Sequence, residues 1–162
     1  MSIKDQVTPE QLKTLVSAPG AASTIVSMAS GGAFETLKEV FSASKFAAEL
    51  SGKAGGSGYG VVVDDLLELM KGMDLKDARE NTVEFETKDR ASVRDELKKI
   101  IADAAVIVSS VPGGDGFKRF LMDMARKTAE AKTGGFLGIG AKSVVDDAEQ
   151  SVLKEIAAIL GQ

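Results

Sequence analysis

The feature that most constrains this chain is the spacing of apolar residues between Ser92 and Val111. Apolar residues recur there at intervals of three and four positions, which is the repeat of one face of an α-helix. The series is Val93, Leu97, Ile100, Ile101, Ala104, Val108 and Val111. Residues 102–111 are apolar on nearly every side apart from Asp103, so we expect that end of the helix to be central to the core.

Similar periodicity predicts helices along most of the chain. They cover residues 9–18, 21–29, 33–50, 61–73, 75–80, 116–132 and 146–160. Pro19 and Gly20 are expected to end the first of these, because proline interrupts a helix. Residues 81–87 alternate between apolar and polar, and both an extended and an irregular structure remain open for them. The prediction is an all-α, compact bundle of six to eight helices.

The length of 162 residues predicts one helical domain, residues 1–162, with a substantial core. Residues 52–60 hold five glycines in nine positions and form the best candidate for a connector between two halves. No apolar run approaches the length needed to span a bilayer, and the first residues lack the basic and apolar regions of a secretory signal. We therefore expect no membrane span and a cytoplasmic location.

The residue types that are missing restrict the chemistry of this chain. It contains no cysteine and no histidine, which removes thiolate nucleophiles, thiolate and imidazole metal ligands, and most serine–histidine catalysis. A metal site would use oxygen ligands alone, as Ca²⁺, Mg²⁺ and Mn²⁺ prefer. The net charge of −4 argues against binding to nucleic acid, which depends on basic side chains.

A weak internal repeat emerges when the chain is shifted by 83 positions. Its matched pairs are Gly31 with Gly114, Phe34 with Phe117, Leu37 with Phe120, and Phe41 with Met124. Each unit is an apolar helix end, a glycine-containing loop and a helix that starts with phenylalanine. Helical periodicity alone also generates such matches, so both explanations stay open.

Over residues 20–132 this helix pattern resembles the TerB-like family, the all-helical bacterial domains associated with tellurite resistance. Asp115 and Gly116 resemble the family's Asp–Gly element, whereas Gly32 and Ala33 at the matching first-half positions lack the carboxylate. The resemblance implies two related halves, an association with stress responses, and metal binding by acidic residues in the loops between helices.

Acidic side chains are the candidates for a metal site. Asp64 and Glu68 are four residues apart and share one helix face, where they can hold a hard cation together with water. Asp115 is the third candidate. The competing interpretations are a solvated helix face for the first two and a helix N-cap for Asp115. A hydrolase that uses paired carboxylates is a further, weaker hypothesis.

The segment from Gly134 to Gly140 interleaves Phe136, Leu137 and Ile139 with four glycines. It is not a phosphate-binding loop, because Ala141 interrupts the motif before Lys142 and no strand precedes it. The three apolar side chains either tuck under the chain's own bundle or contact a partner.

The leading hypothesis for the whole chain is a non-enzymatic interaction or stress-associated module without a cofactor, which binds a protein partner or a second copy of itself. The alternative is a domain that binds Ca²⁺, Mg²⁺ or Mn²⁺.

Overall fold

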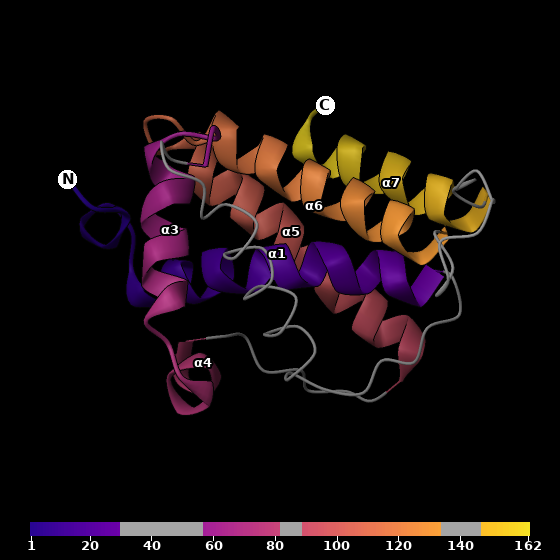
Figure 1. Cartoon of the computed structure of the whole chain (residues 1–162), viewed down its shortest axis with the longest axis horizontal. Coiled ribbons are helices and arrows are strands. Elements are labelled where there is room, and N and C mark those ends of the chain that lie inside the picture. Colours follow the sequence, from indigo (N-terminus) through magenta and orange to yellow (C-terminus); the bar gives the residue numbers. More distant parts are fainter. Residues whose placement is uncertain (30–56, 82–88, 134–146) are drawn as a thin grey trace.

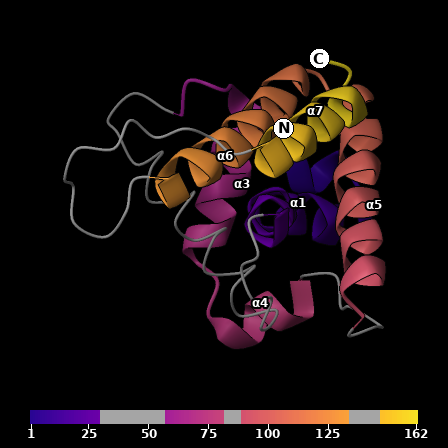
Figure 2. The same cartoon turned by 90° about the vertical axis from the view of Figure 1, so that its right-hand side faces the viewer.

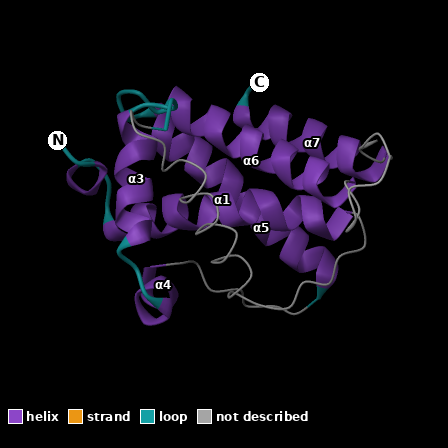
Figure 3. Cartoon of the chain, in the orientation of Figure 1, coloured by secondary structure: helices purple, strands orange, loops and turns teal. Residues whose placement is uncertain are grey.

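The computed structural model describes residues 1–29, 57–81, 89–133 and 147–162, and these ranges contain helices, turns and loops but no strand (Figures 1 and 3). In chain order the elements are the 3-10 helix η1 (Ile3–Asp5) and the α-helices α1 (Pro9–Ala29), α3 (Val61–Lys71), α4 (Leu75–Asn81), α5 (Arg90–Ser109), α6 (Asp115–Thr133) and α7 (Asp147–Leu160). The all-α prediction is confirmed.

Five helices of at least eleven residues, namely α1, α3, α5, α6 and α7, build the bundle in the described part of the chain. This is slightly fewer than the six to eight predicted, since α4 has only seven residues and lies at the periphery. The predicted helix at 33–50, residues 82–87 of the alternating segment and the first unit of the repeat lie outside the described residues.

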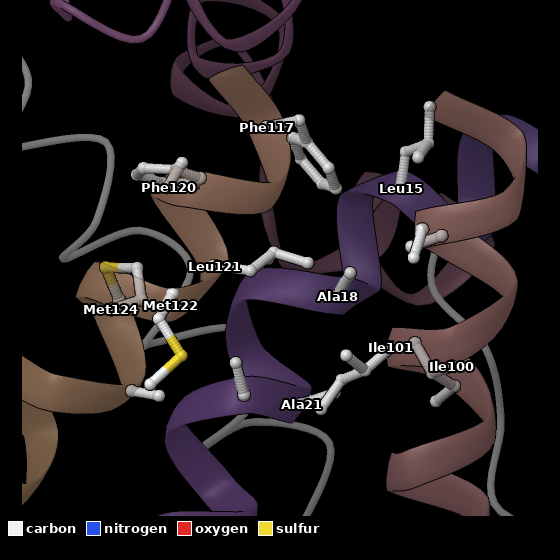
Figure 4. Packing of buried hydrophobic residues seen from close by; sticks show 14 of the residues in the cluster. Leu15, Ala18, Ala21, Ile100, Ile101, Phe117, Phe120, Leu121, Met122 and Met124 are labelled. Carbon is white, nitrogen blue, oxygen red and sulfur yellow. The ribbon is translucent and has the colours of Figure 1, made fainter. Parts of the chain in front are cut away.

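Helix α1 is the centre of the molecule. It packs against α5, α6, α7, α3 and α4, and Figure 2 shows it end-on among them. Every residue from Leu15 to Val26 is buried. Small side chains such as Ala18 and Ala21 let the neighbouring helices approach closely, and Figure 4 shows both lying between the apolar residues of α5 and α6. A helix buried on all sides explains why α1 lacks a polar face.

The predicted break at Pro19 was wrong, because α1 continues through it to Ala29. Proline in a helix interior removes one backbone hydrogen bond and costs about 3 kcal/mol. Burial of α1 against α5 and α6 offsets this cost, because tertiary packing supplies most of the stability of a helix in a protein.

Thr8 and Gln11 fix the start of α1. The backbone N–H of Gln11 donates to Thr8 Oγ1 at 3.2 Å, and the backbone N–H of Thr8 donates to Gln11 Oε1 at 2.9 Å. This reciprocal pair is a capping box, which satisfies two backbone donors at once.

Helix α5 buries the predicted apolar series, from Val93 through Val108, against the core. Its apolar end departs in part from the prediction, since Val106, Ser109 and Ser110 are exposed. Val106 is 71% exposed, because α5 lies at the edge of the bundle and turns one side to solvent (Figure 2). The prediction that residues 102–111 are central to the core therefore holds for the side that faces α1.

None of the described helices combines the length and apolarity needed to cross a membrane.

Candidate functional site

The acidic residues of α3 do not converge on a common point. Asp64 Oδ1 accepts a hydrogen bond from the backbone N–H of Ser57 at 2.7 Å. Asp65 Oδ2 accepts one from the backbone N–H of Ile3 at 3.0 Å. The side chain of Glu68 is 82% exposed, with Lys71 Nζ 3.9 Å away. Two of these carboxylates thus hold other segments of the chain in place, which is a structural use.

Asp115, the remaining metal candidate, is the first residue of α6. Its side chain is 96% exposed, and Lys118 Nζ lies 4.0 Å from its carboxylate. Within the described ranges, no group of three or more acidic side chains is arranged to hold a metal ion. The structure therefore leaves Asp64, Glu68 and Asp115 as separate residues.

A polar and aromatic cluster forms where residues 57–60, here called the strap, lie against α6. The Tyr59 hydroxyl donates to Asp123 Oδ2 at 2.9 Å, and the Tyr59 ring meets Phe120 edge to face at 5.3 Å between centroids. The guanidinium of Arg126 lies 3.4 Å from Asp123 Oδ1. The sequence interpretation of residues 52–60 as a plain connector missed this docking. The only tyrosine of the chain, set among glycines, was the available signal.

The environment of Tyr59 favours its protonated form. Partial burial raises the pKa of the Tyr59 hydroxyl, and the nearby Asp123 carboxylate raises it further, while Arg119 opposes the change. The phenol therefore keeps its proton at neutral pH and serves as a hydrogen-bond donor. Through this hydrogen bond the cluster anchors the strap to α6.

Alkaline pH provides a test of this anchor. Because the folded pKa of Tyr59 is raised, its contribution to stability is complete below the usual tyrosine pKa of about 10 and is lost as the pH rises beyond it. We expect urea denaturation to show a greater loss of stability above pH ~10 for the wild type than for Tyr59→Phe. Equal losses in both proteins would contradict a raised pKa.

Gly116 is explained by packing rather than by a metal site. A Cβ atom added at Gly116 would lie 1.6 Å from the carbonyl oxygen of Tyr59. Only glycine allows the strap to approach the first turn of α6 so closely. The Asp115–Gly116 pair that carries the TerB-like resemblance thus contains one exposed carboxylate and one glycine that the strap requires.

A second charged cluster joins α5 to α7. Glu155 accepts from Lys98 Nζ at 2.7 Å and from the guanidinium of Arg94 at 3.1 Å. The hydrogen bond from Lys98 lowers the pKa of the Glu155 carboxyl, and the positive charges of Arg94 and Lys98 lower it further, while partial burial acts in the opposite direction. All three side chains remain about a third or more exposed, so this cluster is a surface clamp between the two helices.

The clamp predicts an acid-dependent loss of stability. A glutamate with a lowered folded pKa stabilises the protein fully above its ordinary pKa of about 4.3, and this contribution disappears as the pH falls through the folded pKa. We expect Glu155→Gln to lower the free energy of unfolding by about 1 kcal/mol at pH ~7. Urea denaturation at pH ~3 should show a smaller difference, and an equal difference at both pH values would contradict the clamp.

The apolar candidates Phe136, Leu137 and Ile139 lie outside the described residues. The helices on either side of them are described, and the end of α6 and the start of α7 are found at the same end of the bundle (Figure 1). Comparison of this chain with protein-family models, with curated proteins and with solved structures finds no match.

Proposed function

We propose that this chain is a cytoplasmic, non-enzymatic interaction module, TerB-like in outline with two related halves, that binds a protein partner or a second copy of itself through Phe136, Leu137 and Ile139. The observation that carries the proposal is the sequence of residues 134–140, where these three large apolar side chains alternate with four glycines. Large apolar side chains are costly to expose to water unless something covers them.

The positions of the described residues support this proposal over metal-based chemistry. The carboxylates of Asp64 and Asp65 are engaged by backbone N–H groups, and those of Glu68 and Asp115 point to solvent. Hydrogen bonds that hold the fold account for the first two without a ligand. A protein that binds its partner through an apolar segment does not require a bound metal ion.

The helices that flank the segment support a contact role. Helix α6 ends at Thr133 and α7 begins at Asp147 at one end of the bundle, where α1 also ends and α5 begins (Figure 1). That end is fixed by the Arg90 guanidinium, which donates to the carbonyl of Met28 at 2.5 Å. A connection anchored on rigid helices at both of its ends is a common place for binding residues.

The test is a triple variant, Phe136→Ser, Leu137→Ser and Ile139→Ser, with Val106→Ser on the exposed side of α5 as the control. If the three residues face a partner, the free energy of unfolding of the monomer should change by less than about 1 kcal/mol in urea denaturation. If they belong to the chain's own core, the loss should reach about 5 kcal/mol, and the proposal fails.

Native mass spectrometry on the same proteins measures their oligomeric state and any bound metal ion, so it tests self-association and the cation-binding alternative in one experiment. A dimer in the wild type and in Val106→Ser that becomes a monomer in the triple variant identifies a second copy as the partner. Addition of Ca²⁺, Mg²⁺ or Mn²⁺ tests the cation-binding alternative. A stoichiometric mass increase that Asp64→Asn with Glu68→Gln abolishes would favour that alternative.

A further inference from the structure

We infer that the strap is a gate, by which we mean a segment that opens locally. It moves away from α6 by rotation at Gly58 and Gly60 while the helices of the bundle stay in place, and the contacts of Tyr59 with α6 hold it closed. Both glycines adopt positive φ angles, 77° at Gly58 and 97° at Gly60. Glycine reaches positive and negative φ about equally, so these positions can rotate where other residues would be restricted. A Cβ at either glycine would meet no atom within 4 Å, so the positive φ, and not steric crowding, is what favours glycine at these positions.

The contacts that hold the strap closed are concentrated in one residue. Tyr59 contributes the hydroxyl bond to Asp123, the edge-to-face contact with Phe120, and a backbone N–H that donates to Ser57 Oγ at 3.1 Å. The Tyr59 side chain is only partly buried. Few contacts and little buried area are the properties of segments that open locally, at a lower free energy than global unfolding.

The helix that follows the strap is held much more firmly. Helix α3 begins directly after Gly60 and buries Val62, Val63, Leu66, Leu67 and Met70. The first residue of the strap is tied to this helix, because the backbone N–H of Ser57 donates to Asp64 Oδ1 at 2.7 Å. The opening is therefore confined to the residues between Ser57 and α3.

Opening changes the surface of α6 at a defined place. In the closed state Phe120 is 5% exposed, and the Tyr59 carbonyl lies against Gly116. When the strap swings away, one edge of the Phe120 ring becomes accessible to solvent, and Asp123, whose side chain is already 40% exposed, loses the Tyr59 hydroxyl as a donor. This gate is independent of the proposed function, since the strap lies against the first turn of α6, whereas Phe136, Leu137 and Ile139 come after Thr133, its last residue.

Amide hydrogen exchange of the full chain, followed by NMR at single residues, tests the gate. In the wild type we expect the Tyr59 amide to exchange faster than the central amides of α5, with a rate that does not respond to low concentrations of urea. Tyr59→Phe should speed exchange of that amide about tenfold, because it removes a hydrogen bond to a charged acceptor. Asp123 keeps Arg126 as its partner in this variant.

Two alanine variants separate local opening from general destabilisation. Gly58→Ala should also speed exchange of the Tyr59 amide about tenfold, because alanine is strained at positive φ only while the gate is closed. Gly161→Ala is the matched control, since Gly161 also has positive φ (71°) and open space but follows α7. It should leave exchange at Tyr59 unchanged.

Two results would overturn the gate. One is a Tyr59 amide that exchanges at the same rate and with the same urea dependence as the α5 amides, since it would open only on global unfolding. The other is an equal effect of Gly58→Ala and Gly161→Ala at Tyr59, because the acceleration would then be a general loss of stability.

Discussion

Replacement of Phe117 by alanine is expected to lower the free energy of unfolding by about 3–5 kcal/mol, the range for a buried phenylalanine. Phe117 is 0% exposed and is among the largest fully buried side chains. Its ring packs against that of Phe120 at 6.3 Å between centroids, and Figure 4 places it beside Leu15 of α1. Removal of the ring leaves a cavity at the junction of α6 and α1, which rigid helices cannot fill. Urea denaturation measures the effect.

The matched control for Phe117→Ala is Val106→Ala on α5. Val106 is 71% exposed, so this truncation should change stability by less than about 0.5 kcal/mol. A change of below about 1 kcal/mol in Phe117→Ala would mean that Phe117 does not belong to the core, and it would contradict the packing of α6 against α1.

Gly114→Ala is the second substitution with a large expected effect, about 3 kcal/mol of lost stability. A Cβ at this position would lie 1.8 Å from the carbonyl oxygen of Val108 and 2.6 Å from its carbonyl carbon. Both atoms belong to the backbone of α5, so the added methyl group must push the last turn of α5 away from α6. A lower denaturation midpoint with an unchanged urea dependence is the expected result.

Gly72→Ala provides the comparison for this substitution. Gly72 has a φ of −80°, and a Cβ there would meet only the carbonyl oxygen of Leu69, at 3.7 Å. Alanine fits this conformation and reduces the entropy of the unfolded chain, so stability should stay the same or rise by up to about 1 kcal/mol. A similar loss in Gly72→Ala and Gly114→Ala would show that the close approach of Gly114 to α5 is not the cause.

Local sequence patterns were sufficient to predict most of the helices. The apolar spacing of α5 was read from neighbouring residues, and the capping box at Thr8 likewise joins residues only three positions apart. These signals work because helix periodicity and capping depend on residues three or four positions apart. Pro19 is the exception, since its local signal was opposed by burial of α1 on every side.

The candidate site could not be predicted in the same way. Asp64 and Glu68 have the spacing of a solvated or metal-binding helix face, yet Asp64 binds the backbone of the strap and Glu68 is 82% exposed. The neighbouring Asp65 binds the backbone of η1. The docking of Tyr59 against Asp123 and Phe120 was also missed, because the glycines around Tyr59 favoured a connector.

The amino-acid sequence was enough to predict the all-α class, the positions of most helices, and a chemistry without thiols and imidazoles. The central place of α1, the docking of Tyr59 on α6 and the Glu155 clamp between two helices came to light only in the folded chain. The partners in these contacts are far apart along the chain. Ile3 and Asp65 are 62 residues apart, Tyr59 and Asp123 are 64 apart, and Arg94 and Glu155 are 61 apart. Such pairs meet only when the helices pack, because no local pattern specifies them.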